Sequence, residues 1–138
     1  MGVNANNKKK IKEAGGIPPL IELSRSRNVS VSVEAIAALA NLAVNDANEI
    51  EIARLGGLEP ILDGVGSSHM DLQSQSARAL RNLSVHPDNK AEIIKLDGMK
   101  ILKDLVREAM DERVRLQASK ALANLGTPED VDEEYGHK

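Results

Sequence analysis

The sequence contains no cysteine, tryptophan or phenylalanine, and Tyr135 is its only aromatic residue. The lack of cysteine excludes disulfides and thiolate zinc sites. No apolar run approaches the roughly 18 residues that a membrane-spanning helix needs, and the start of the chain shows no signal-peptide pattern. We therefore expect a core of aliphatic side chains, no membrane insertion, and a location in the cytoplasm with the nucleus as an alternative.

Residues that carry chemistry are also scarce. The histidines His69, His86 and His137 fall in a loop, a turn and the tail, without a paired carboxylate or metal-ligand spacing beside them. The formal net charge is −3, and five acids between 126 and 138 account for the acidity. The remaining chain is nearly neutral and lacks aromatic residues for base stacking, which argues against nucleic-acid binding. The sequence therefore predicts no enzyme, no cofactor and no metal site.

The main positive feature is a repeat with a period of 41 residues. Periods of this length are typical of stacked helical arrays. Four columns recur once in each copy: Asn7, Asn48 and Asn89; Ile11, Ile52 and Ile93; Gly16, Gly57 and Gly98; Asn41, Asn82 and Asn124. The last column slips by one residue, so we expect one insertion in a loop near residues 108–112. The resulting division is an N-terminal extension (1–6), three repeats (7–47, 48–88 and 89–126) and an acidic flexible tail (127–138).

Each repeat is predicted to form three helices. In the second repeat, Asn48 is expected to cap a short helix that Gly56 and Gly57 end, because glycine enters the left-handed region at little cost. Pro60 suits the first turn of the next helix, where its missing N–H needs no partner. The third and longest helix of each repeat is expected over 30–44, 71–85 and 111–125.

The third helices end in the same pattern, Ala-Leu-x-Asn-Leu, at 38–42, 79–83 and 121–125. This pattern, after a short helix that ends in Gly-Gly or Asp-Gly, resembles the armadillo repeat family. The resemblance covers nearly the whole chain. It implies an all-α, right-handed solenoid of three armadillo repeats, in which the third helices line a concave groove that holds extended peptides.

Helical geometry indicates which residues would line this groove. Successive residues of a helix are rotated by 100°. A polar stripe is therefore formed by the recurring Asn together with the residues four, seven and eleven positions before it. A separate apolar stripe on another side of the helix includes Leu39, Leu80 and Leu122. An Asn side chain both donates and accepts, as is needed to bind the backbone of an extended peptide. The predicted groove residues are Asn41, Gln75, Arg78, Asn82, Gln117, Lys120 and Asn124. The alternative is that the Asn residues only bond to the adjacent repeat.

The charges on this stripe indicate what the groove prefers. Members of the family that resemble importin-α carry Trp four residues before the recurring Asn, where this chain has Ala37, Arg78 and Lys120. The cations resemble a β-catenin-like groove, which implies acidic partners, and Arg81 lies at the rim. The alternative is that Arg78 and Lys120 are solvated charges balanced by acids such as Glu34 and Asp71.

Two functions remain open from the sequence. The first is a protein interaction module that binds an extended, acidic peptide. The second is a structural segment of a longer armadillo protein that acts through its stacking ends or convex face. Weak self-association through the solenoid ends is expected at Leu116, on the flank of the last helix. Residues 129–134 are either a solubilising tail or an internal pseudo-ligand of the groove.

Overall fold

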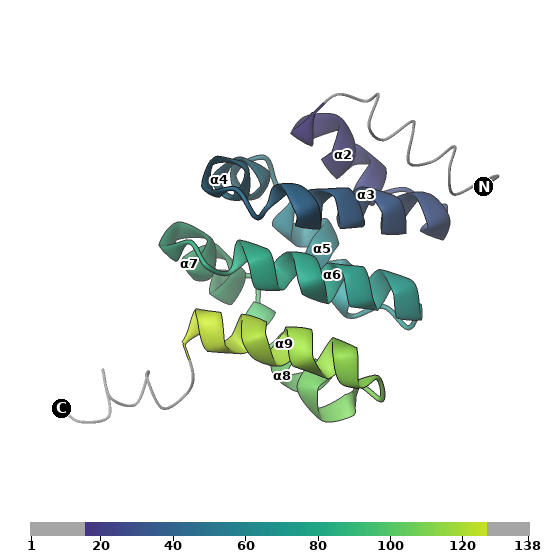
Figure 1. Ribbon diagram of the computed structural model, residues 1–138, viewed down its shortest axis with the longest axis vertical. Helices are drawn as coiled ribbons and strands as arrows, with labels where there is room; N and C mark the ends of the chain where they lie inside the picture. The colour runs from purple at the N-terminus through teal and green to yellow at the C-terminus, as the bar shows by residue number, and fades with distance from the viewer. Residues whose placement is uncertain (1–15, 127–138) are drawn as a thin grey trace.

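The computed structural model describes residues 16–126, and every regular element in that range is an α-helix (Figure 1). The helices are α2 (Ile17–Ser24), α3 (Val29–Leu42), α4 (Asp46–Arg54), α5 (Leu58–Val65), α6 (Met70–Leu83), α7 (Pro87–Lys95), α8 (Gly98–Glu108) and α9 (Glu112–Leu125). The predicted third helices are α3, α6 and α9, with ends within two residues of those expected. The predicted extension 1–6, the first helix of the first repeat and the tail 127–138 lie outside the described residues.

The helices are arranged in layers that follow the repeat. Helices α3, α6 and α9 lie side by side, with α6 packed between the other two (Figure 1). Each of them packs against the second helix of its own repeat, which is α2, α5 or α8. The short helices α4 and α7 lie at one edge of the stack (Figure 1). This all-helical solenoid places the third helices on one common surface.

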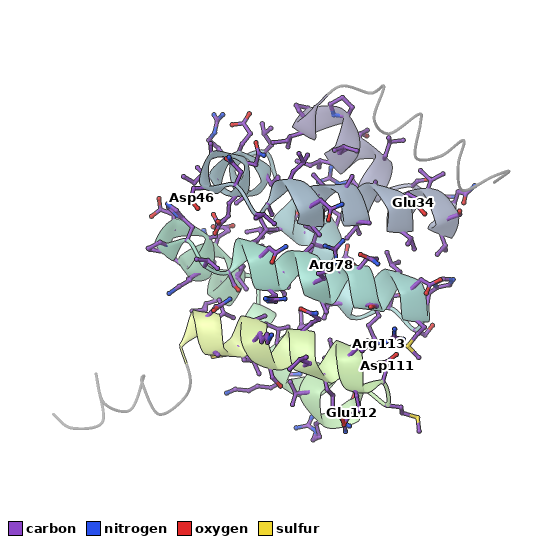
Figure 2. The ribbon with its side chains drawn as sticks, in the orientation of Figure 1. Glu34, Asp46, Arg78, Asp111, Glu112 and Arg113 are labelled. Carbon is purple, nitrogen blue, oxygen red and sulfur yellow. The ribbon has the colours of Figure 1, made fainter. Side chains whose placement is uncertain are left out.

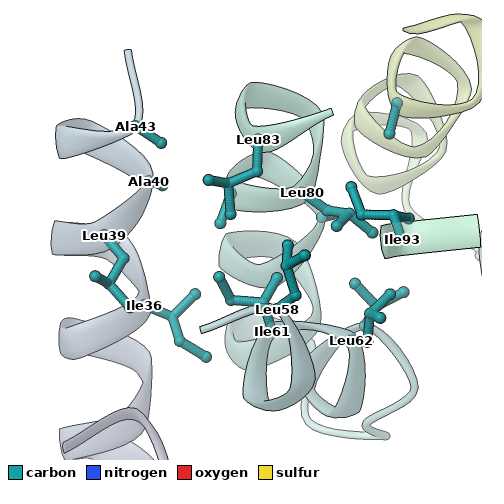
Figure 3. Packing of buried hydrophobic residues seen from close by; sticks show 14 of the residues in the cluster. Ile36, Leu39, Ala40, Ala43, Leu58, Ile61, Leu62, Leu80, Leu83 and Ile93 are labelled. Atoms are coloured by element: carbon teal, nitrogen blue, oxygen red, sulfur yellow. The ribbon is translucent and has the colours of Figure 1, made fainter. Parts of the chain in front are cut away.

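The core is aliphatic, as the composition predicts. Leu39, Leu58, Ile61 and Leu80 meet between neighbouring repeats and are almost completely buried (Figure 3). Of the predicted apolar stripe, Leu39 and Leu80 are buried, whereas Leu122 on α9 is only half-buried. Burying a large aliphatic side chain contributes about 1.5–3 kcal/mol. The stack is therefore stabilised by aliphatic contacts both within each repeat and between successive repeats.

Glycine is favoured for two different reasons at these turns. As predicted, Gly56 has a positive φ of 88°, and the recurring Gly16 has one of 151°. In the second and third repeats the left-handed residue is the one before the recurring glycine, which is Gly56 or Asp97 (φ 65°). At Gly57, whose φ is −73°, a Cβ atom would lie 2.7 Å from Ile52 Cγ2. At Gly98 it would lie 2.3 Å from Ile93 Cγ2. In the second and third repeats the Ile and Gly columns therefore contact each other, and the recurring glycine is required there by close approach rather than by a left-handed turn.

The prediction that Asn48 caps the short helix is wrong. Asn45 caps α4, because its Oδ1 accepts from the N–H of Ala47 at 2.9 Å and of Asn48 at 3.3 Å. The Nδ2 of Asn48 instead donates to the Leu42 carbonyl at 3.0 Å. The last carbonyls of a helix lack intrahelical partners, and this bond supplies one. This Asn column therefore fixes the turn between one repeat's third helix and the next repeat's first.

The single inserted residue lies in the predicted interval, but it lengthens helix α8 instead of the loop near 108–112. A shift of 41 residues maps Gly57, which precedes α5, onto Gly98, the first residue of α8, whereas a shift of 42 maps Met70 of α6 onto Glu112 of α9. The insertion therefore lies between Gly98 and Glu112. Helix α8 has 11 residues against 8 in α5, whereas the following loop has 3 residues (109–111) against 4 (66–69), so the extra length is taken up in the helix. The packed face of α9 keeps its register.

Candidate functional site

The seven predicted groove residues all lie on the layer of third helices. Figure 2 shows Arg78 between α3 and α6, near the middle of this layer. Asn41 is on α3, Gln75, Arg78 and Asn82 are on α6, and Gln117, Lys120 and Asn124 are on α9. Because these helices are adjacent, the residues form a polar band across them, which we call the α3–α6–α9 face. Asn41 and Lys120 are exposed, and the other five are half-buried.

Two Asn residues on this face, Asn82 and Asn124, bond to the preceding repeat. Asn82 Nδ2 donates to the Ala40 carbonyl at 2.8 Å, and Asn124 Nδ2 donates to the Arg81 carbonyl at 3.0 Å and to Ser84 Oγ at 3.1 Å. An Asn amide has two N–H donors and a carbonyl acceptor. Within residues 16–126, no hydrogen bond reaches the Oδ1 atoms of Asn82 and Asn124. These residues therefore hold the stack together and still present an acceptor.

Arg78 joins α3 to α6. Its Nη1 donates to Asn41 Oδ1 at 3.0 Å, and its Nη2 donates to the Ala37 carbonyl at 3.3 Å. Its Nε and Nη2 also donate to Gln75 Oε1, at 3.1 and 2.9 Å. These bonds occupy four of the five guanidinium N–H groups. Arg78 is thus partly a link between repeats, a role that the sequence analysis did not identify.

Arg81 makes the corresponding link from α6 to α9. Its Nη1 donates to Gln117 Oε1 at 3.1 Å, and this is its one side-chain hydrogen bond to another residue of the described chain. Four of its five N–H groups therefore remain available. The sequence analysis placed Arg81 at the rim. The structure places its guanidinium beside the predicted groove residue Gln117.

Arg78, Arg81 and Lys120 have no acidic partners in the part of the chain that the structure describes. The ion pairs there are formed by Arg54, Lys100, Arg107, Arg113 and Arg115. Of these, Arg113 lies on the same polar stripe, eleven residues before Asn124, and pairs with Asp111 at 3.3 Å. The predicted balancing of Arg78 and Lys120 by Glu34 and Asp71 is therefore not found at ion-pair distance.

The surroundings of Arg78 affect its protonation. Partial burial lowers the pKa of Arg78 below its usual value, and the positive charge of Arg81 lowers it further. Both effects disfavour the charged form of Arg78. The usual pKa of an arginine is so high that Arg78 nevertheless keeps its charge at neutral pH. The face therefore carries positive charge that the described chain itself does not neutralise.

A hollow of about 730 Å³ lies away from the predicted residues. It is bordered by the end of α2, the first half of α3, α5, and residues of α6 and α8, and none of the seven predicted residues lines it. Two of its serine hydroxyls already donate to backbone carbonyls, Ser24 to Ile21 and Ser32 to Ser26. The charged side chains of Arg25, Glu59 and Asp63 also line it, and none of them forms an ion pair within residues 16–126.

The two histidines in the described range, His69 and His86, lie at the starts of helices. His86 Nδ1 accepts from the Asp88 N–H at 3.2 Å and caps α7, while His69 occupies the position before α6. Residues 16–126 contain no group of three or more His, Asp or Glu side chains that could hold a metal ion. In the same residues, no helix is both long and apolar enough to cross a membrane.

The chain belongs to the armadillo repeat family. The family model for the Armadillo/beta-catenin-like repeat matches residues 4–44 and 86–127. The segment between the two matches contains α4, α5 and α6, which repeat the same three-helix arrangement. The resemblance drawn from the recurring Asn, Ile and Gly columns is therefore confirmed, and so is the all-α solenoid fold.

Solved structures support the same assignment. An engineered protein is 32% identical with a TM-score of 0.77, over 86% of this chain and 49% of its own. An armadillo-repeats-only protein from Plasmodium falciparum is 26% identical with a TM-score of 0.71, over 89% of this chain and 54% of its own. A designed armadillo repeat protein in complex with the peptide (KR)4 is 23% identical with a TM-score of 0.75, over 86% and 50%, a likeness of fold alone.

The chain spans about half the length of the first structural relatives that it matches. Among curated proteins, the comparison finds no match.

Proposed function

We propose that this chain is a peptide-binding module whose α3–α6–α9 face holds an extended, acidic segment of a partner protein. The observation that carries the proposal is the set of cations on this face, Arg78, Arg81 and Lys120, none of which has a carboxylate partner within residues 16–126. The chain would act by binding, without catalysis of its own.

The spacing of the face suits an extended peptide. Packed helices lie about 8–10 Å apart, and an extended chain advances about 3.3 Å per residue. Successive helices of the layer would therefore meet about every third residue of the ligand. The free Oδ1 atoms of Asn82 and Asn124 could accept N–H groups of the peptide backbone, which otherwise lose their partners when water is displaced.

The positive charge of this face favours a ligand of the opposite sign to the peptide bound by the designed relative. That protein is in complex with a basic peptide, (KR)4. In this chain Arg78, Arg81 and Lys120 would repel such a ligand, because like charges in a water-poor groove destabilise each other. An acidic segment would remove the repulsion that Arg81 exerts on Arg78. We therefore assign the present face to acidic ligands.

A fluorescence titration tests this proposal. A labelled ten-residue peptide with Asp or Glu at every third position is expected to bind in the micromolar range, and at least tenfold more tightly than (KR)4. Raising the salt concentration from 0.05 to 0.5 M should strongly weaken the binding of the acidic peptide, because salt screens the attraction between its carboxylates and the cations. Equal affinity for the two peptides, or affinity that salt leaves unchanged, would contradict the proposal.

One observation favours the second function, a structural segment that acts through the end of the stack. Leu116 on α9 is 52% exposed, whereas Val33 and Ser74, its counterparts in the two preceding repeats, are less exposed beside the next third helix. Covering a leucine contributes about 1.5–3 kcal/mol, enough for a weak dimer. We expect sedimentation equilibrium to show self-association that Leu116→Lys abolishes. A wild-type protein that stays monomeric at high concentration would rule this function out for an isolated chain.

A further inference from the structure

We propose that the hollow beside α5 is a second binding site, which takes a basic amphipathic segment of a partner protein. The ligand carries lysine or arginine side chains next to large aliphatic ones. The site is separate from the α3–α6–α9 face and takes a ligand of the opposite charge, so it goes beyond the proposed function. With both surfaces, one chain can hold an acidic and a basic segment at the same time.

The hollow lies mainly along the layer of second helices. Its lining residues come from the end of α2, from α5 and from the start of α8, and from the first halves of α3 and α6. In the view of Figure 1, α5 lies behind α3 and α6. The volume of about 730 Å³ falls within the range of about 300–1,000 Å³ that is typical of ligand sites. The space is therefore large enough for several side chains of a partner.

Part of the lining is apolar and still in contact with water. Leu72, Leu96 and Ile101 line the hollow from α6, from the turn after α7 and from α8, and all three are only half-buried. Removing apolar surface from water is favourable, and the gain grows with the area that is covered. Aliphatic side chains of a ligand would supply that cover.

Two exposed carboxylates, those of Glu59 and Asp63, also line the hollow. They are four residues apart on α5, and residues at this spacing are neighbours on one side of a helix, with Cβ atoms about 5–6 Å apart. Neither carboxylate forms an ion pair with another residue of the described range. A cation of a ligand in the hollow would therefore meet a pair of negative charges that the chain itself leaves uncompensated.

Arg25 is the cationic side chain among the described residues that line the hollow. Its Nη2 donates to the Gly56 carbonyl at 3.3 Å, and it forms no ion pair with Glu59 or Asp63. The lining side chains thus carry two negative charges and one positive charge. A basic segment is attracted by this arrangement, whereas an acidic one is repelled by it.

Two serines favour a peptide over a simple organic cation. Ser26 Oγ accepts from the Asn28 N–H at 3.1 Å, and Ser67 Oγ accepts from the His69 N–H at 3.0 Å. A hydroxyl that accepts still has its own O–H to donate. Both serines line the hollow, so these O–H groups can donate to backbone carbonyls of a ligand. Peptides combine such carbonyls with aliphatic and basic side chains.

The test uses the fluorescence of the ligand, because the chain contains no tryptophan. The probe is a short peptide of leucine and lysine with one tryptophan. It is expected to bind in the micromolar range, with a shift of the tryptophan emission to shorter wavelength as the ring leaves water. Two matched peptides, with serine for leucine or glutamate for lysine, should each bind about tenfold more weakly, because each lacks one of the two attractions.

Variants locate the effect. Glu59→Gln and Asp63→Asn should each weaken the binding of the basic peptide about threefold, and together about tenfold, as is typical of exposed ion pairs. Both side chains are exposed and unpaired within residues 16–126, so folding is preserved. Arg25→Gln should strengthen binding about twofold, because it removes a repelling charge. The control is Glu22→Gln, which makes the same change of charge at an exposed residue of α2 outside the hollow and should bind as the wild type does.

The outcomes separate this inference from the proposed function. Wild-type affinity in the double variant of Glu59 and Asp63, or an equal loss in Glu22→Gln, would overturn the site in the hollow. Weaker binding in Arg25→Gln would show that the ligand meets the hollow through an anion and would also overturn it. Equal binding of the leucine and serine peptides would reduce the effect to general charge attraction, with the same consequence.

A competition experiment completes the test. The acidic peptide of the proposed function should leave the tryptophan signal of the basic peptide unchanged, because the two ligands occupy different surfaces. Displacement of the basic peptide from the wild-type chain would contradict the separate site while leaving acidic-peptide binding intact. Binding of the basic peptide alone, with no binding of the acidic one, would support the hollow and contradict the proposed function instead.

Discussion

Replacing Gly98 with alanine is expected to lower the free energy of unfolding by about 2–3 kcal/mol, at the upper end of the range for overpacked sites. The new Cβ would lie 2.3 Å from Ile93 Cγ2 and 2.7 Å from the Ile93 carbonyl oxygen. The side chain of Ile93 can rotate, but its carbonyl belongs to α7 and cannot retreat without moving that helix. Helices α7 and α8 would therefore separate, and the last repeat would lose contacts with the second.

Urea denaturation measures this loss, with Gly66→Ala as the matched control. Gly66 follows α5 with an ordinary φ of −83°, and its added Cβ would meet only the Asp63 carbonyl oxygen, at 3.7 Å. Alanine there should leave the stability unchanged or raise it by up to about 1 kcal/mol, because it restricts the unfolded chain. A wild-type midpoint in Gly98→Ala, or equal losses in both variants, would show that close approach does not explain the recurring glycine.

Reversing the charge of Lys120 is expected to weaken the binding of the acidic peptide about 30-fold. The substitution Lys120→Glu changes the local charge by two units, and one pair of charges at about 4 Å contributes on the order of 1 kcal/mol in water. The total effect is then about 2 kcal/mol, which corresponds to the 30-fold loss. Lys120 is exposed and forms no ion pair within residues 16–126, so the change leaves the fold intact.

Lys103→Glu provides the matched control, because it makes the same change of charge on α8, outside the layer of third helices. Its effect on affinity should be less than threefold at 0.15 M salt, where charges more than about 8 Å apart are largely screened. Calorimetric titration of both variants distinguishes a local contact from a general effect of net charge. Similar losses in the two variants would argue that the peptide does not lie on the α3–α6–α9 face.

The fold was predictable from the sequence because its signals are repeated. Three copies of one pattern located α3, α6 and α9, and the slip between Asn82 and Asn124 located the inserted residue. The cap was not predictable in the same way. Asn45 and Asn48 lie three residues apart, and either could begin α4 until the end of α3 is known. The contact between the Ile and Gly columns could not be predicted from the sequence. Both columns are visible in the sequence, but the distance between them depends on the path of the chain.

The residues of the candidate site were predictable, but their partners were not. A polar stripe at 100° per residue places Arg78 and Asn82 on α6 and gives no information about the neighbouring helix. The structure shows that Arg78 bonds to the carbonyl of Ala37, the residue in the same column one repeat earlier. Arg81 was assigned to the rim because its angle differs from that of the Asn column. Its importance follows from Gln117, which only the packing of α9 on α6 brings within reach.

The measurement that tests the central claim most directly is a nuclear magnetic resonance titration of isotopically labelled protein with the acidic ten-residue peptide. The account predicts that the side-chain resonances of Arg78, Arg81, Asn82 and Gln117 shift together, with one dissociation constant, while the backbone of α5 and α8 stays unchanged. Shifts centred on α8 or on Leu116, with the arginine and amide side chains unaffected, would contradict the claim that the α3–α6–α9 face is the binding site.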